Sequence, residues 1–321
     1  IRDRLQVGRR FFPQRASGPF GEVDPRSLRE IDRVYAYSPR KDRRFFGYCE
    51  EHALVLEFGE ELAALEPGRP TYLFLGGSLE YPYSQTNFAS QQAGVTWDPP
   101  RVERQEPDGS WTTLVPDAGA PGGMARTIAV DLTGALPAGP VTLRLVTTLE
   151  LYFDRVFLAQ DLGPEGLEVR TVPLQRAELR RLGFPQEYSP DGRDPRIYSY
   201  DYIEASFGFQ RLPGSYTRYG DVRELLGDFD DRYVVMATGD EIALDFDASA
   251  LPEPAEGMAR TWVLVSHAWC KDMDIHSVGP GTVEPLPFAG MSGYPYPEGE
   301  SYPWSDDARA WQQRYNTRVI R

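Results

Sequence analysis

The chain alternates between short apolar runs and turn residues, and this pattern favours β-strands. Residues 53–58 and 72–77 are leucine-rich runs, while residues 141–146 place Val141, Leu143 and Leu145 at every second position. Alternation with a period of two is typical of a strand with one buried face, and a continuous apolar run is typical of a strand buried on both faces. Further strands are predicted at residues 34–37, 102–105, 111–115, 127–132, 149–158 and 167–173.

The second half of the chain mixes predicted strands with a few helical segments. Strands are predicted within residues 197–209 and at 233–236, 242–246 and 261–266, with a turn at 238–240. Short helices are predicted at 177–184, 221–226 and 306–315, the last with Ser305 or Asp306 as its cap. Residues 81–97 are predicted to form a long aromatic and polar loop.

These elements predict a mainly β protein made of two β-sandwich, jelly-roll-like domains with a few short helices. We expect an extended N-terminal arm over residues 1–28, a β-sandwich domain over 29–165 and a second β-rich domain over 166–290. A Pro/Tyr-rich tail with a short C-terminal helix fills 291–321. Both ends carry aromatic rings but little periodicity, so we expect at least one end to lie against another chain or across the domain boundary.

Net charge and the length of apolar runs exclude some classes of binding partner. The 321 residues carry a net charge of −14, which argues against a nucleic-acid footprint and against docking on anionic lipid. No apolar run reaches the length of a membrane span. The two cysteines, Cys49 and Cys270, lack metal-ligand spacing, and a disulfide between them stays open because sequence cannot place their Cα atoms.

One candidate metal site follows from alternation in the segment CKDMDIH. Cys270, Asp272, Asp274 and His276 share a face if the segment is extended. The oxygen ligands of Asp272 and Asp274, with His276, point to calcium, and the full set could instead hold a transition metal. The alternative is an acidic loop that follows the predicted strand at 261–266. No other cofactor is predicted.

A candidate ligand surface lies in the aromatic loop. Tyr81, Tyr83, Phe88 and Trp97 stand where jelly-roll modules often present sugar-binding loops. Stacking on a sugar requires exposed rings, but we expect these four rings to pack between loop and sheet, because buried rings contribute so much apolar area.

Signals for catalysis are weak. Glu50, Glu51 and His52 follow Cys49, but neighbours in sequence rarely form a nucleophile and its base. The chain has no nucleophile elbow, phosphate-binding loop or zinc-protease motif. Paired carboxylates for glycoside hydrolysis stay open, since nothing in the sequence selects a pair.

Six segments, in order along the chain, carry a family resemblance. They are residues 77–89 (GSLEYPYSQTNFA), 149–154 (LELYFD), 217–235 (TRYGDVRELLGDFDDRYVV), 268–274 (AWCKDMD), 283–288 (VEPLPF) and 315–318 (YNTR). The chain resembles the C-terminal β-rich region of bacterial secreted cartilage-acidic-protein-like (ASPIC/UnbV) proteins, which carry FG-GAP or TPR repeats. Phe153 stands where those proteins usually have Trp, and the position of His276 is usually not His. The resemblance brings no catalytic residues to transfer.

The resemblance implies an extracytoplasmic location and an interaction role. We therefore expect a non-catalytic structural or interaction protein, an accessory subunit or module of a larger assembly with protein partners. The alternative is a carbohydrate-binding module with a glycan partner, and a hydrolase is the third hypothesis. The start of the chain, Ile1-Arg2-Asp3-Arg4, has no apolar signal segment, so we expect it to be a piece of something longer.

Overall fold

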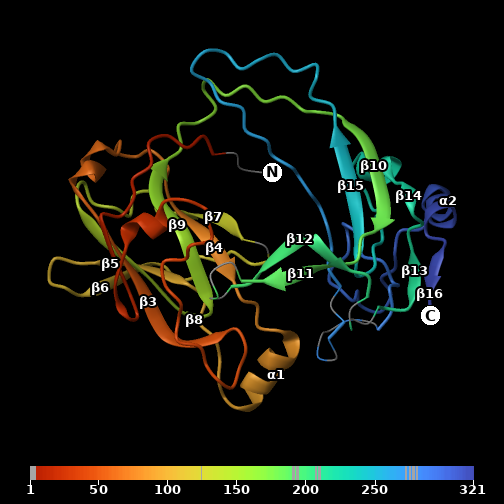
Figure 1. Cartoon of the computed structure of the whole chain (residues 1–321), viewed down its shortest axis with the longest axis horizontal. Coiled ribbons are helices and arrows are strands. Elements are labelled where there is room, and N and C mark those ends of the chain that lie inside the picture. Colours follow the sequence, from red (N-terminus) through yellow and green to blue (C-terminus); the bar gives the residue numbers. More distant parts are fainter. Residues whose placement is uncertain are drawn as a thin grey trace. The chain divides into compact units, whose positions relative to one another are not determined.

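A computed structural model describes residues 5–123, 125–189, 192, 195–206, 208, 211–271, 273–274, 276, 279 and 281–321. The protein is mainly β, as predicted, with several antiparallel sheets (Figure 1). The chain divides into two compact units: residues 1–167 with 191–195, and residues 168–190 with 196–321. No helix in the described part of the chain has the length and apolarity that crossing a membrane requires.

The first unit contains two antiparallel sheets. One has the order β2 (Gly21–Val23), β1 (Arg15–Gly18), β3 (Tyr48–Phe58), β8 (Val141–Leu149), β5 (Arg101–Gln105) and β6 (Trp111–Val115). The other has the order β7 (Arg126–Asp131), β4 (Thr71–Leu79) and β9 (Leu151–Gln160). Leu56 and Leu143 from the first sheet share a core with Leu73 and Leu158 from the second. The alternating residues Val141, Leu143 and Leu145 are all buried, as their spacing predicted.

The N-terminal residues belong to this unit, and part of the predicted arm forms the strands β1 and β2. β1 pairs with β3, and Phe11 exchanges backbone hydrogen bonds with Leu158 of β9 at 2.8 Å in both directions. Phe12 lies against Phe157, which stacks on Phe74 with ring centroids 4.8 Å apart. The apolar strand β4 is therefore buried on both faces, since the N-terminal segment covers the face that turns away from the core.

The remaining elements of the first unit are helical. They are the 3-10 helices η1 (Pro25–Leu28) and η2 (Glu60–Ala64) and the α-helix α1 (Ser84–Gln92). Helix α1 lies inside the segment that was predicted to be a loop. Its sequence, SQTNFASQQ, has a single large apolar residue and hence no amphipathic period to detect.

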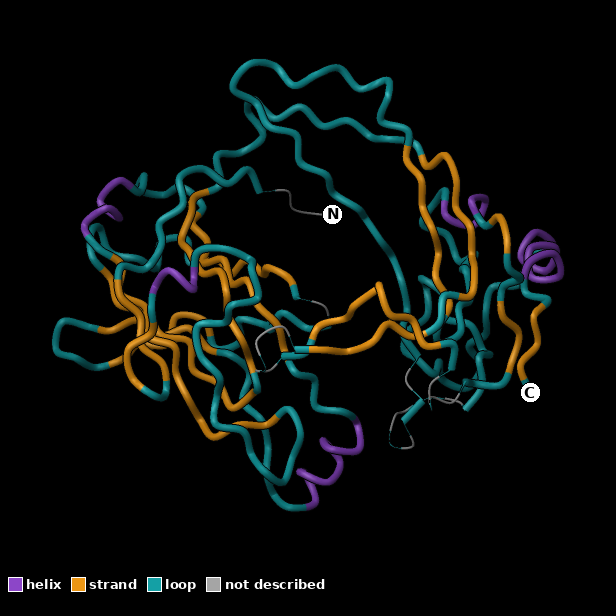
Figure 2. The backbone as a smooth tube through the Cα atoms, in the orientation of Figure 1, coloured by secondary structure: helices purple, strands orange, loops and turns teal. Residues whose placement is uncertain are grey.

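The second unit is built from three small antiparallel groups. One sheet has the order β14 (Gly220–Asp221), β10 (Leu174–Arg181) and β15 (Asp240–Phe246). The two-stranded groups are β11 (Phe184–Tyr188) with β12 (Ile197–Glu204), and β13 (Gly214–Tyr216) with β16 (Arg318–Ile320). Long connections without regular structure join these groups (Figure 2).

Aromatic residues from the C-terminal part complete the core of this unit. Ala177 and Leu179 of β10 pack with Phe288, and with Tyr302 and other apolar residues of the segment 291–321 that was predicted to be a tail. The helix α2 (Asp306–Tyr315) begins at Ser305, whose hydroxyl accepts the Ala308 N–H as predicted. It buries Ala308, Trp311 and Tyr315. The 3-10 helix η3 (Arg223–Leu226) occupies the predicted helical segment at 221–226.

Four predicted strands do not form. Residues 34–37, 167–173, 233–236 and 261–266 have no strand structure. Residues 177–184 were predicted to be helical, but most of them belong to β10. Ala, Glu, Leu and Arg favour a helix, yet Ala177 and Leu179 face the core at strand spacing, and pairing with β15 outweighs that local propensity.

Candidate functional site

The rings predicted to lie between loop and sheet are exposed, so that expectation is wrong. The exposed fractions are 59% for Tyr81, 55% for Tyr83, 44% for Phe88 and 44% for Trp97. Phe46, which the sequence did not single out, stacks on Tyr83 with centroids 5.5 Å apart and an interplanar angle of 13°. We call these five residues the aromatic set. Within the aromatic set, Phe46 and Tyr83 form a stacked pair.

A glycine turn and a pair of side-chain hydrogen bonds fix the segments that carry the aromatic set. Gly47 has φ +78°, and a Cβ there would stand 2.7 Å from the backbone nitrogen of Pro82, so the close approach of these segments requires glycine. The Tyr48 hydroxyl donates to Asn87 Oδ1 at 2.8 Å and lies 2.7 Å from Ser90 Oγ. Strand β3 therefore positions helix α1, and with it Tyr83 at the N-cap and Phe88 within the helix.

Two of the three predicted calcium ligands, Asp274 and His276, belong to the described residues. Asp272 lies outside the described residues. Asp274 Oδ1 accepts the backbone N–H of His276 at 2.9 Å, a local turn contact that occupies one carboxylate oxygen. Among the described residues, no group of three or more His, Cys, Asp or Glu side chains has a geometry suited to a metal ion. The two cysteines are free thiols, with Cys49 buried and Cys270 exposed, so the open question of a disulfide is answered against one.

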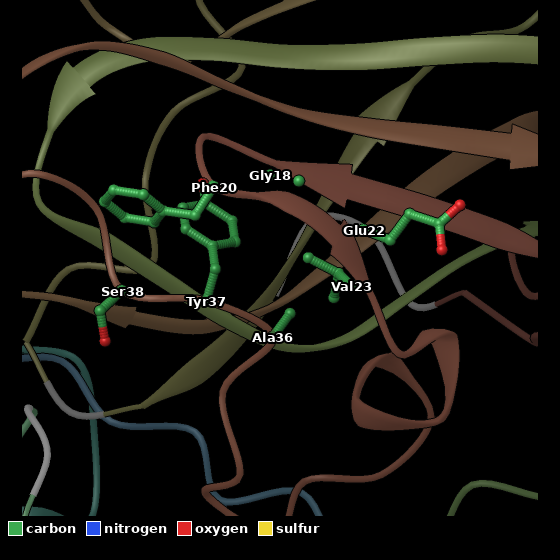
Figure 3. Close-up of a pocket in the computed structure, with 8 residues that line it drawn as sticks. Gly18, Phe20, Glu22, Val23, Ala36, Tyr37 and Ser38 are labelled. Atoms are coloured by element: carbon green, nitrogen blue, oxygen red, sulfur yellow. The ribbon is translucent and has the colours of Figure 1, made fainter.

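A hollow of about 320 Å³ opens beside the β1–β2 hairpin (Figure 3). Figure 3 shows the rings of Phe20 and Tyr37 on one side, with Val23 and Ala36 beside them and the Glu22 carboxylate pointing away. Glycines 18 and 21 and Ser38 complete the lining. The lining is polar and apolar in nearly equal parts, and its one charged side chain, Glu22, has no second charged group beside it in the lining that could carry a reaction.

The cysteine and histidine of β3 are not arranged for catalysis. Burial and the charge of Glu150 raise the pKa of Cys49 to about 12, so the thiol stays protonated and unreactive. Burial lowers the pKa of His52, whose Nδ1 lies 2.9 Å from the backbone oxygen of Glu50 and whose ring contacts Tyr37. Glu150 is itself fully buried and paired with Lys41 Nζ at 2.7 Å.

Asp154 is the most perturbed carboxyl of the first unit. It is 1% exposed, and its Oδ2 accepts only a long contact from the Arg33 N–H at 3.4 Å. Oδ1 has no hydrogen-bond partner in the described part of the chain. Burial therefore raises the pKa of Asp154 to about 6. Perturbed carboxyls often mark sites, but the lining of the hollow does not include this one.

A second exposed surface lies in the second unit. Residues 252–270 are all exposed, and they include the predicted strand TWVLVS. Trp262, Val263 and Leu264 are 58%, 64% and 66% exposed. We call residues 261–266 the apolar segment. Its far end is held by a contact between the rings of His267 and Phe229 with centroids 5.6 Å apart.

No model of a known protein family matches this chain, and no curated protein matches it either. The resemblance to the cartilage-acidic-protein-like group therefore stays a prediction.

Proposed function

We propose that this protein is a non-catalytic extracytoplasmic interaction protein, an accessory subunit or module of a larger assembly. The extracytoplasmic part of this proposal depends on the family resemblance alone. The interaction part depends on the apolar segment. The two chain ends do not support it, because their rings pack largely within their own units.

The exposure of the apolar segment is the observation that carries the proposal. Four consecutive large apolar residues, 262–265, stand in solvent at 44–66% exposure. Monomeric proteins rarely leave contiguous apolar surface uncovered, and tryptophan is among the residue types enriched at interfaces. A partner that covers the segment in the assembled state would account for its exposure in the isolated chain.

The test compares the isolated chain with the chain in a gently prepared extract of the source cells. We expect the native protein to migrate as a larger complex, with residues 252–270 protected from proteases there and cleaved in the isolated chain. The double substitution Trp262→Asp and Leu264→Asp should abolish the complex. Val319→Asp, which changes an exposed apolar residue on β16, is the matched control. Equal cleavage in both preparations contradicts the proposal.

A carbohydrate-binding module is the second candidate, favoured by the exposure of the aromatic set. Sugar rings stack on exposed aromatic faces, and the Phe46–Tyr83 pair offers such faces, with Phe46 in the turn before β3 and Tyr83 at the N-cap of α1. A glycan array tests this function with Tyr83→Ala and Trp97→Ala. Saturable binding that both substitutions weaken supports it, with Trp262→Ala as the control. Binding that is absent, or unchanged in the variants, contradicts it.

A further inference from the structure

Two features of the second unit lack a strand partner among the described residues. Strand β15 pairs with β10 along one edge, and its other edge is open. The apolar segment 261–266 has the composition of a strand but no pairing. An open edge and an unpaired strand are complementary, since each has the backbone donors and acceptors that the other needs.

We propose that the apolar segment of one copy of this protein adds as a strand to the open edge of β15 in a second copy, and that the exchange is reciprocal. This inference deepens the proposed interaction function by naming the partner. Because every copy has both the edge and the strand, two copies satisfy each other in a closed two-fold dimer.

Length and side-chain pattern support the pairing. In an antiparallel register, residues 261–266 match residues 246–241 one for one. Val263 and Val265 then lie opposite Leu244 and Ile242. Those two residues pack against the core of the unit, next to Ala177 and Leu179 on β10. The added strand therefore extends an apolar face that already exists.

Charge agrees with the same register. Arg260, just before the apolar segment, falls beside Asp247, just after β15. At present the Arg260 guanidinium lies 5.6 Å from the Trp262 ring centroid and donates to the Pro252 oxygen at 2.6 Å. In the paired form, opposite charges would stand at the same end of the added strand, which favours this register over a shifted one.

The connection between the two features favours a second copy over closure within one chain. Residues 247–260 include Pro252 and Pro254, which restrict the backbone to extended conformations. Asp247 and Ser249 already form a local turn through two hydrogen bonds of 2.9 and 2.6 Å. The segment consequently stands unpaired, although its own β15 is near in sequence. In a second copy the same segment reaches a β15 edge without folding this connection back, so pairing between copies leaves the Asp247–Ser249 turn in place.

The test uses two chains with one engineered cysteine each, Ala243→Cys and Leu264→Cys, both with Cys270→Ser. Directly opposed residues in an antiparallel pair have Cα atoms about 4.5–5.5 Å apart, within disulfide range. We expect co-expression of the two chains to give a mixed disulfide dimer on a non-reducing gel. We also expect the native chain to have a dimer's mass by light scattering. Glu178→Cys on β10, with Leu264→Cys, is the matched control and should not crosslink.

Two results would overturn the inference. If the double variant Ala243→Cys and Leu264→Cys closes a disulfide within one chain and the protein stays monomeric, the apolar segment pairs with its own β15. If no disulfide forms in either experiment, the segment does not pair with β15. Either result leaves the proposed function standing if the native protein still migrates in a larger complex that Trp262→Asp and Leu264→Asp abolish.

Discussion

The hydroxyl of Tyr48 donates a hydrogen bond of 2.8 Å to Oδ1 of Asn87, joining strand β3 to helix α1 across 39 residues of sequence. Tyr48→Phe removes this bond and the contact with Ser90 Oγ, and Asn87 Oδ1 loses its Tyr48 donor, while the Ser90 hydroxyl keeps its bond to the Asn87 backbone oxygen. We expect a loss of about 1–3 kcal/mol in the free energy of unfolding. Hydrogen exchange at residues 84–92 should become faster, since the bond holds α1. Unchanged exchange there would show that α1 does not depend on Tyr48.

Leu143 tests the core of the first unit. It is fully buried on β8, and Leu143→Ala should lower the free energy of unfolding by roughly 2–5 kcal/mol. The neighbouring Thr142 points to the other face and is half-buried, so Thr142→Ala is the matched control with a smaller expected loss. Denaturant unfolding of both variants measures the difference. Equal losses would mean that the faces of β8 are assigned wrongly.

The raised pKa of Asp154 predicts that the protein loses stability as the pH rises. Its folded-state pKa of about 6 lies above the usual 3.8, so the folded state holds the proton more tightly than the unfolded chain. Its contribution to stability is thus full below about pH 4 and declines as the pH rises to 6, by up to roughly 3 kcal/mol. Asp154→Asn cannot ionise. We expect its melting temperature, relative to the native protein, to rise between pH 4 and pH 7.

The control for this titration is Asp131→Asn, which changes an exposed carboxylate at the end of β7. Its melting temperature relative to the native protein should show no comparable rise over the same range. Parallel curves for Asp154→Asn and the native protein would contradict the assignment of a raised pKa to this carboxyl.

Calcium binding at Asp272, Asp274 and His276 stays a prediction. If the ion is bound, EDTA should lower the melting temperature and added calcium should restore it, because a ligand that binds the folded state stabilises it. Asp274→Ala should abolish that response, while Asp228→Ala, which changes an aspartate outside this segment, should preserve it. A melting curve that neither EDTA nor calcium moves leaves Asp274 as part of an acidic loop.

The longer strands of the first unit could be predicted because their side chains alternate or form short apolar runs, whereas the short strands β1 and β2 could not. β8 and the pair β5–β6, with its Asp-Gly turn, illustrate this. Helix α1 could not be predicted, since tertiary bonds to Tyr48 hold it rather than an apolar stripe. The strand β10 was missed for a related reason, because its partner β15 is about 60 residues away, and no local pattern reveals such a pairing.

Sequence also predicted some features of the candidate site and missed others. Sequence identified Tyr81, Tyr83, Phe88 and Trp97 as a group, but it could not decide their exposure, because large rings suit both cores and surfaces. Phe46 was missed since its contact with Tyr83 depends on the glycine turn that follows it. The apolar segment was predicted as a strand from its residues. That it has no partner strand among the described residues is a property that sequence cannot reveal.

Substitution of two phenylalanines near the N-terminus tests whether residues 5–13 are part of the fold. Phe11 is 5% exposed and lies in the core of the first unit, whereas Phe20, at the edge of the hollow, is 66% exposed. Phe11→Ala should therefore lower the free energy of unfolding by roughly 3–5 kcal/mol, while Phe20→Ala should change it by about 0.5 kcal/mol or less. Chemical denaturation of the two variants measures the contrast. If both substitutions are equally mild, residues 5–13 are a detachable arm after all, and the outer face of β4 must be covered by something other than this segment.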